Sequence, residues 1–238
     1  ARAAGKPVVV VFLGADPKSI ARKGVHAVKT LEDAARAAVA IVRGEKPRDS
    51  YADVPDLPAG LPKLAGSQRY IRGLYSGGTF CYEATLLLGE LLDEVYSNTP
   101  TRNVRELADV WLSHHHTLVD LGDDVFTRGR PHPMIDYRLR TERIVKEAED
   151  PQTAVILLDV VLGHGSHMDP ASEFVPAIHR ARAAAQGRNV VFVGQICGTS
   201  ADPQDLARQS RALTEAGMLL TESNAQAVRL AAAIVDAH

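Results

Sequence analysis

The fold is decided by residues 154–160, which read AVILLDV, an apolar run interrupted only by Asp159 near its end. A second run of the same kind, NVVFVGQ, occupies residues 189–195. Nearly continuous apolar runs of this length are typical of central strands in a parallel sheet, which are buried on both faces. The segment 171–186 between them has the spacing of an amphipathic helix, as a crossover between parallel strands requires. The sequence therefore predicts an α/β fold.

Outward from these runs, apolar strands alternate with amphipathic helices from Tyr70 to the C-terminus. The expected strands are 71–75, 117–121, 154–160, 189–195 and 218–221, and the expected helices are 79–96, 103–115, 136–149, 171–186, 203–216 and 224–237. This alternation predicts a flavodoxin-like parallel sheet with helices on both faces. In such sheets ligands bind in the loops beyond the carboxyl ends of the strands, so the functional residues are expected there.

An internal repeat indicates how the chain is divided. Residues 24–42 align without a gap on residues 217–235, and a strand at Val8–Leu13 parallels one at Val190–Gly194. We therefore expect residues 1–45 to be the C-terminal part of a first domain of the same fold, whose beginning lies outside this chain. Residues 46–69 are rich in proline and glycine and are predicted to be a linker. Residues 70–238 are predicted to be one complete domain.

Composition excludes several classes of protein. The net charge of -2 gives no basic excess for nucleic-acid binding. No apolar run approaches the roughly 20 residues that span a bilayer, and no secretory signal precedes Val8. The two cysteines, Cys81 and Cys197, are too few for a disulfide framework or a thiolate metal site. These features predict a cytoplasmic protein with reduced thiols, bound neither to nucleic acid nor to a membrane.

The loop after the strand 71–75 is a candidate anion site. It contains Ser76, Gly77, Gly78 and Thr79 and leads directly into a helix. Glycines allow close approach of a ligand to the backbone, and the free amides of a helix start attract phosphate or carboxylate. The alternative is that Ser76 or Thr79 caps the helix and the glycines only make the turn.

The loop after the strand 117–121 combines carboxylates, guanidinium groups and an imidazole. Two arginines at the carboxyl end of a strand are suited to bidentate recognition of a small acid. An ordinary solvated polar loop is the alternative. The candidate binding residues of this loop are Asp123, Asp124, Arg128, Arg130 and His132.

Two further loops follow the strands 154–160 and 189–195. In the first, Asp159 and His164 are the candidate catalytic residues, because an imidazole titrates near neutral pH and a carboxylate can orient a donor. A metal site of His164, His167 and Asp169 is a weaker alternative, and no metal is expected. The glycines and hydroxyl of these loops, Gly163, Gly198 and Thr199, are candidate binding residues.

Two other groups have a structural as well as a functional interpretation. Cys197 could be a reactive thiol with a lowered pKa, or a small apolar filler, which is the commoner case. The run His114-His115-His116 is expected to end the helix 103–115 at the surface, since imidazoles suit the negative end of a helix dipole.

Three motifs, in order, resemble the CoA-ligase domain of the succinyl-CoA synthetase alpha subunit. They are GLYSGGTFCYEA at residues 73–84, GDD at residues 122–124 and DPQTAVIL at residues 150–157. The FdrA-like branch is more similar still, through LGDDVFTRGRPHPMID at residues 121–136 and LLDVVLG at residues 157–163. The resemblance implies a nucleotide-binding acyl-CoA synthetase, an acid-thiol ligase acting in a complex of related subunits. CoA and ATP or ADP would be bound by the missing domain or by partner subunits, and this fragment alone requires neither.

The chain departs from the synthetase pattern in one loop. The family places its phosphorylated histidine after the strand that corresponds to 189–195, where residues 198–205 read GTSADPQD without histidine. The resemblance therefore leaves three functions open. The first is a succinate-CoA-ligase-like subunit that handles an acyl or carbamoyl phosphate and a small carboxylate. The others are a component of an oxamate carbamoyltransferase in allantoin (purine-ureide) catabolism, and a non-catalytic scaffold subunit.

Overall fold

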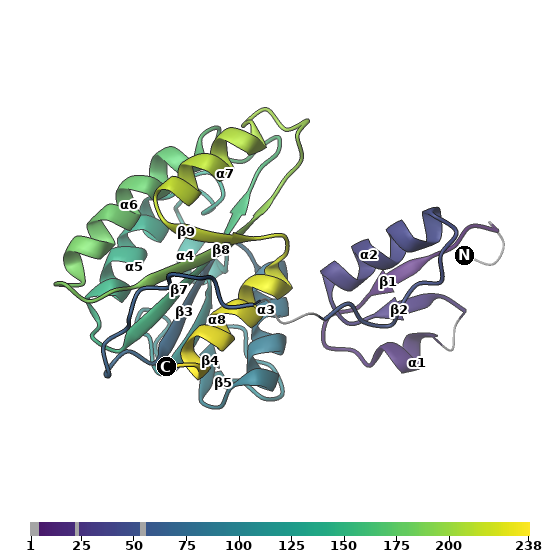
Figure 1. Ribbon diagram of the computed structural model, residues 1–238, viewed down its shortest axis with the longest axis horizontal. Coiled ribbons are helices and arrows are strands. Elements are labelled where there is room, and N and C mark those ends of the chain that lie inside the picture. Colours follow the sequence, from purple (N-terminus) through teal and green to yellow (C-terminus); the bar gives the residue numbers. More distant parts are fainter. Residues whose placement is uncertain (1–4, 22–23, 53–55) are drawn as a thin grey trace. The chain divides into compact units, whose positions relative to one another are not determined.

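The computed structural model describes residues 5–21, 24–52 and 56–238. It divides into two compact units, Ala1–Val54 and Pro55–His238, and each is described by itself (Figure 1). None of the helices in the described residues is long and apolar enough to span a membrane.

The second unit is built on a parallel sheet of seven strands in the order β5-β4-β6-β3-β7-β8-β9. The five strands β6-β3-β7-β8-β9 have the chain order 2-1-3-4-5, which is the flavodoxin order and confirms the predicted fold class. The strands are β3 (Tyr70–Tyr75), β4 (Val95–Ser97), β5 (Arg105–Glu106), β6 (His116–Asp120), β7 (Thr153–Val161), β8 (Val191–Cys197) and β9 (Met218–Thr221).

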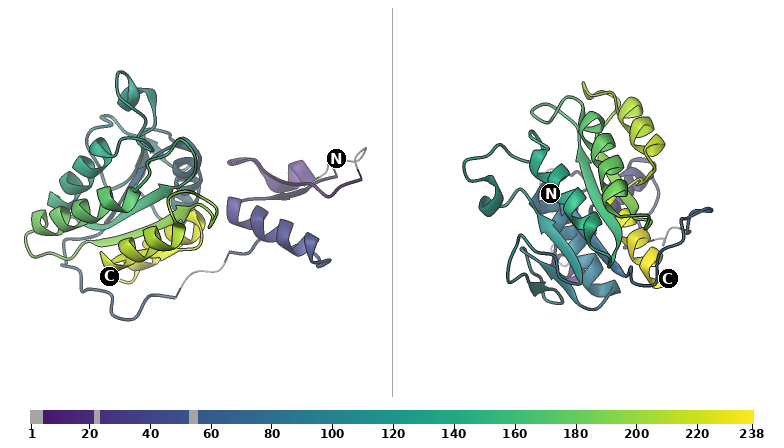
Figure 2. Two further views of the ribbon diagram at one scale, coloured as in Figure 1. Left: turned by 90° about the horizontal axis from the view of Figure 1, so that it is seen from above. Right: turned by 90° about the vertical axis from the view of Figure 1, so that its left-hand side faces the viewer.

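Helices cover both faces of this sheet, as Figures 1 and 2 show. Helices α3 and α8 pack on one face, and α5, α6 and α7 pack on the other. Two separate apolar clusters fill the spaces between helices and sheet, so the central strand β7 is buried on both sides. The helices are α3 (Gly78–Leu91), α4 (Asp124–Thr127), α5 (Arg138–Glu149), α6 (Pro170–Ala184), α7 (Leu206–Glu215) and α8 (Asn224–Asp236).

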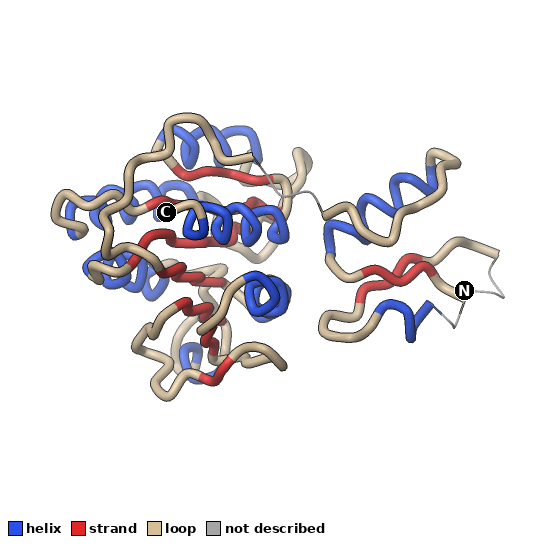
Figure 3. Tube along the Cα trace, turned by 60° about the horizontal axis from the view of Figure 1, so that its bottom comes forward, coloured by secondary structure: helices blue, strands red, loops and turns tan. Residues whose placement is uncertain are grey.

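The first unit repeats the order of elements at the end of the second (Figure 3). Gly24 and Gly217, which are aligned in the repeat, both have positive φ, at 80° and 83°. Thr30 and Ser223, also aligned, both cap the following helix by accepting from the backbone N–H three residues on. The two strands of this unit pair in parallel. Its elements are β1 (Val9–Val11), α1 (Pro17–Ala21), β2 (His26–Val28) and α2 (Leu31–Val42).

The wider assignment of residues 1–45 to a further domain stays a prediction, and residues 1–4 lie outside the described part. The expected linker contains no helix or strand in its described residues 46–52 and 56–69. Its later part belongs to the second unit and packs against the sheet: Leu64 is buried, and Gln68 donates to the carbonyl oxygens of Thr153 (2.7 Å) and Asn189 (2.6 Å). These bonds hold it at the amino ends of β7 and β8.

The predicted helix 103–115 is wrong. Residues 105–106 instead form the strand β5. Val104 and Leu107, on either side of this strand, are buried although they belong to no helix. The Leu107 N–H donates to the Ser97 carbonyl at 3.1 Å, so the backbone extends the sheet at its edge rather than bonding within a helix. The predicted helix 79–96 is also too long, because α3 ends at Leu91 and Val95–Ser97 form β4. The apolar residues of these segments have a spacing that suits a helix, but in the structure they are buried at the edge of the sheet.

The three histidines are not at the end of a helix. His116 lies in β6 and is buried, and its Nδ1 accepts the Ile71 N–H at 3.2 Å. His115 stacks on His114 and on Tyr70, with ring centroids 4.2 Å and 5.0 Å apart. The expectation that all three lie on the surface is therefore wrong for His116, because the sheet begins one residue earlier than predicted.

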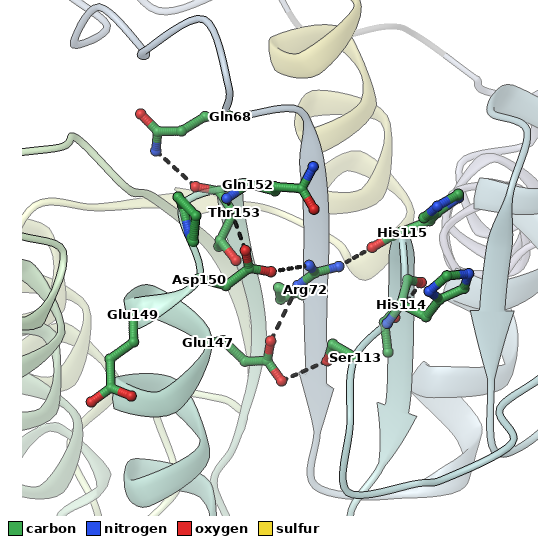
Figure 4. Close-up of polar contacts among 12 residues, drawn as sticks. Gln68, Arg72, Ser113, His114, His115, Glu147, Glu149, Asp150, Gln152 and Thr153 are labelled. Carbon is green, nitrogen blue, oxygen red and sulfur yellow. Dashed lines mark hydrogen bonds and ion pairs between the residues drawn. The ribbon is translucent and has the colours of Figure 1, made fainter.

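A buried arginine fixes the chain that enters β6 (Figure 4). Arg72, on β3, donates to the His115 carbonyl and forms ion pairs with Glu147 (3.1 Å) and Asp150 (2.5 Å). Glu147 in turn accepts a hydrogen bond from the Ser113 hydroxyl at 2.6 Å. Side chains of α5 and β3 thereby hold residues 113–115, which is a second reason why this segment is not helical.

Candidate functional site

The carboxyl ends of β3 and β7 form the centre of the candidate site. These adjacent strands flank the point where the chain reverses its direction across the sheet, the usual ligand position in this topology. Ser76 follows β3 directly, and its backbone N–H donates to Asp159 Oδ1 at 2.8 Å while its hydroxyl donates to Oδ2. The Ser76 hydroxyl is thus engaged by Asp159 and does not cap α3.

Helix α3 begins without a side-chain cap. Its N-cap residue is Gly77, in extended backbone at φ −170°, and a side chain added there would meet nothing within 4 Å. The alternative in which Ser76 or Thr79 caps the helix is therefore wrong. Gly78 and Thr79, the first residues of α3, are exposed, and a helix start without a side-chain cap suits an anion.

A second buried arginine holds Asp159 in place. Arg140, on α5, is fully buried, and its Nη2 donates to Asp159 Oδ1 (2.8 Å), to the Asp159 carbonyl (2.8 Å) and to the Leu74 carbonyl (2.9 Å). Its guanidinium also lies over the Phe174 ring, 4.9 Å from the centroid. The sequence analysis missed Arg140. The sequence did contain a signal for it: Arg140 precedes Ile144 by one helical turn, so a charged residue lies on the side of the predicted helix that faces the core.

The loop after β6 reaches the same centre. A side chain on Gly122 would lie 2.8 Å from His132 Nε2 and 2.9 Å from the Ser76 carbonyl oxygen, so these three residues meet. His132 Nδ1 accepts the Met134 N–H at 3.2 Å, which directs Nε2 toward Gly122. Asp120, at the end of β6, accepts the Gly122 N–H at 2.8 Å and was also missed by the sequence analysis.

The other predicted residues of this loop lie further out. Asp123 caps the short helix α4 by accepting the Val125 N–H at 3.0 Å, and Asp124 and Arg128 are exposed. Arg130 lines a cavity of about 260 Å³ next to the start of α5. The remaining lining residues are Phe126, Pro131, Pro133, Asp136, Arg138, Leu139 and Glu142.

The loops after β7 and β8 are tied together by two buried glutamines. Gln204 donates to the Gly163 carbonyl (2.7 Å) and accepts the Gly163 N–H (3.1 Å). Gln209 accepts the Ala171 N–H (2.8 Å) and donates to Asp169 Oδ1 (3.0 Å). His164 is exposed in the first of these loops.

The remaining candidates have ordinary structural contacts. In the second loop the Thr199 N–H donates to Asp202 Oδ2 at 2.6 Å, and Gly198 packs against Leu162. Asp169 pairs with Arg208 at 2.9 Å instead of facing His164 and His167 as metal ligands. Within the described residues, no three His, Cys, Asp or Glu side chains are grouped as a metal site would require.

The hypothesis of a lowered thiol pKa at Cys197 is wrong. Partial burial of the sulfur raises the pKa of Cys197, and the Asp159 and Asp202 carboxylates raise it further. Negative charge near a thiol disfavours the thiolate, so Cys197 is not an activated nucleophile. Cys81 is buried in the core cluster under α3, and burial raises its pKa as well.

Comparison with known proteins assigns the family. The CoA-ligase family model matches residues 74–234. The uncharacterized protein YahF of Escherichia coli (strain K12) is 39% identical over 228 residues, which cover 94% of this chain and 44% of YahF. The crystal structure of PH0766 from Pyrococcus horikoshii OT3 has 13% identity and a TM-score of 0.39, covering 97% of this chain and 46% of that one. The chain thus spans less than half the length of the relatives it matches. The match over most of the second unit shows that the chain belongs to the CoA-ligase family.

Proposed function

We propose that the second unit binds an acyl or carbamoyl phosphate at the carboxyl ends of β3, β6 and β7 and transfers the acyl or carbamoyl group between phosphate and a second small molecule. The observation that carries this proposal is the uncapped start of α3 beside a serine held by Asp159. Residues 1–45, as the end of a related domain, and residues 70–238, as a complete ligase-type domain, would act together with related subunits in a cytoplasmic complex.

The phosphate would bind at Gly77, Gly78 and Thr79. Gly77 leaves open space over the first turn of α3, and the 14-residue helix directs its positive end there. Asp159 does not repel an anion at this place as a free carboxylate would, because Arg140 neutralises it and both its oxygens accept hydrogen bonds from Ser76. His132, whose Nε2 lies close to Gly122, would supply a further donor.

A small carboxylate would bind at Arg130. The cavity next to this guanidinium has apolar walls from Phe126, Pro133 and Leu139, and its volume of about 260 Å³ suits a small acid. Arg138, which also lines it, is already paired with Asp136. Arg130 is therefore the cation of this cavity that we assign to the substrate, since a planar guanidinium binds a carboxylate in bidentate fashion.

The phosphohistidine relay of the synthetases does not fit this chain, because residues 198–205 contain no histidine. Direct transfer needs no such residue, which favours carbamoyl transfer to oxamate or a similar acid as the second candidate function. CoA and ATP or ADP, where the whole protein uses them, would be bound outside this chain or by partner subunits. A non-catalytic scaffold is disfavoured by the buried charges that hold the loops.

The test uses the full-length protein with its natural subunits. Acetonylphosphonate, an analogue of acetyl phosphate that cannot be hydrolysed, is titrated by calorimetry against the wild type and the Gly77→Val variant. Valine fits the extended backbone at Gly77 without a clash but fills the space over the helix start. We expect the variant to lose at least tenfold in affinity, whereas Gly66→Val, also in open surroundings, binds as the wild type does.

Equal affinity of the Gly77→Val variant and the wild type would contradict the proposed phosphate position. Two assays then separate the candidate reactions: acetyl phosphate with CoA, and carbamoyl phosphate with oxamate. Incubation with radiolabelled ATP adds a third readout. An acid-labile phosphoprotein would show that a histidine elsewhere serves the relay and would favour the ligase.

A further inference from the structure

Asp120 has a carboxyl group whose position is fixed by hydrogen bonds to the backbone of the same residue. It ends β6, where Asn98 accepts the Asp120 N–H at 2.9 Å and donates to the Asp120 carbonyl at 3.0 Å. The residue is only 7% exposed. A two-sided amide bridge of this kind fixes the direction in which the side chain leaves the strand.

The two oxygens of Asp120 have different surroundings. Oδ1 accepts the Gly122 N–H at 2.8 Å. Oδ2 faces the start of α3, since a side chain added at Gly78 would lie 3.1 Å from it. Within the described part of the chain Oδ2 has no hydrogen-bond donor, so it is available to a ligand at the phosphate position.

Asp120 belongs to a row of polar side chains at the carboxyl edge of the sheet. It lies opposite Tyr75 on β3, and Asp159 on β7 lies opposite Gln195 on β8. Asp120, Asp159 and Gln195 each come two residues after a side chain of the cluster under α3 and α8, so alternation directs them to that same face. Asp120 thus lies on the face of the sheet that α3, the helix that would hold the phosphate, covers.

The surroundings of Asp120 raise the pKa of its carboxyl above the ordinary value of an aspartate. Burial has the largest effect and raises the pKa of Asp120; the hydrogen bond from the Gly122 amide lowers it, the carboxylates of Asp123 and Asp159 raise it, and His132 lowers it least. From α3, Cys81 interacts electrostatically with Asp120, and its thiol stays neutral because burial raises its pKa. A protonated carboxyl donates to a phosphate oxygen, whereas an ionised one would repel it.

We propose that Asp120 is a catalytic residue that moves the proton between the departing phosphate and the acceptor, an inference that rests on the proposed function. In the transfer, the bond between the acyl carbon and the bridging oxygen breaks, and its electron pair stays on that oxygen. Asp120 gives its proton to this oxygen, which leaves as hydrogen phosphate. The acceptor, a thiol or an amide nitrogen, forms its bond to the acyl carbon and returns its proton to the Asp120 carboxylate.

The test compares Asp120→Asn with the wild type in the full-length protein and its natural subunits. Asparagine keeps the shape and the Gly122 contact but cannot carry the proton. We expect kcat to fall at least about 100-fold for the reactive pair, acetyl phosphate with CoA or carbamoyl phosphate with oxamate, because positioned proton transfer contributes about that much. The affinity for acetonylphosphonate should stay within about twofold.

The pH profile distinguishes proton transfer from a merely structural role. The wild-type kcat should fall as pH rises through the pKa of Asp120, and this limb should be absent in Asp120→Asn. Asp93→Asn, an exposed aspartate far from the loops of the site in sequence, is the matched control with unchanged kcat. If Asp120→Asn keeps both the wild-type kcat and the fall of kcat with rising pH, or if it loses acetonylphosphonate binding, the role of Asp120 is refuted while the proposed function stands. A wild type that neither binds the analogue nor turns over either pair overturns the proposed function as well.

Discussion

Ser76 and Asp159 join neighbouring strands through two hydrogen bonds, in which the backbone N–H and the hydroxyl of one residue reach the two carboxylate oxygens of the other. Arg140 adds a third bond to the same carboxylate, at 2.8 Å. The arrangement sets the backbone of Ser76 just before the glycines that begin α3. A buried ion pair thus fixes the loop in which we place the phosphate.

Replacement of Asp159 should destabilise the domain strongly. In Asp159→Asn the Arg140 guanidinium would stay buried without its carboxylate, and loss of one partner of a buried pair costs about 3–5 kcal/mol. Urea unfolding followed by circular dichroism measures this loss. Arg138→Gln, which breaks the ion pair of the exposed Arg138 with Asp136, is the control and should leave the free energy of unfolding close to that of the wild type. Similar losses in the two variants would show that the Arg140 pair is not a structural determinant.

Gly122→Ala should damage the site by crowding. The new methyl group would lie 2.9 Å from the Ser76 carbonyl oxygen, which is backbone and cannot rotate away. We expect a loss of about 1–3 kcal/mol in stability, the usual cost of overpacking, together with at least tenfold weaker binding of acetonylphosphonate. Calorimetry and urea unfolding measure the two effects. Gly66→Ala has open space around it and should change neither, and full binding by Gly122→Ala would argue against a ligand near Ser76.

The folded protein should lose stability on mild acidification through His116. Burial, together with the smaller effects of the nearby Arg72 and His115, lowers the pKa of His116 from 6.5 to about 4. Between these two values the unfolded chain binds a proton that the folded chain does not, so unfolding becomes easier as pH falls. The contribution is complete above pH 6.5 and is lost progressively toward pH 4, by up to about 3 kcal/mol.

The measurement is the free energy of unfolding of wild type and His116→Asn at several pH values. Asparagine retains an acceptor for the Ile71 N–H but does not titrate. We expect the variant to have a flatter dependence between pH 6.5 and 4, whereas His179→Asn, at an exposed position of α6, should follow the wild type. Parallel curves for wild type and His116→Asn would show that folding does not shift the pKa of His116.

The sheet could be predicted from sequence because its central strands are buried on both faces. The runs at 154–160 and 189–195 became β7 and β8, and the motif order fixed the family. The edge could not be predicted, since β5 pairs only two residues, Arg105 and Glu106, and carries no alternating pattern. Val104 and Leu107 are spaced as on one face of a helix, but an irregular segment can bury two residues at this spacing equally well.

The candidate site was located but not described fully by the sequence. Ser76, Gly77 and Asp159 follow the strands that the apolar runs identify, so their proximity could be expected from topology alone. The contact of Arg140 with Asp159 could not, because its place on the buried side of α5 does not indicate which strand end its guanidinium reaches. Asp120 was overlooked because Asp123 and Asp124 stand in the more conspicuous motif, although Asp120 is the more buried carboxylate.

Gln204 and Gln209 attach the loop after β8 to the loop after β7 almost entirely through uncharged amide groups. Attraction between amides is hardly weakened by dissolved salt, and amides do not gain or lose protons in the physiological range. The relative placement of these loops should therefore be the same in dilute buffer and in concentrated salt, and at pH 5 and pH 9. The Arg208–Asp169 pair beside them is partly exposed and will weaken in salt without releasing the loops.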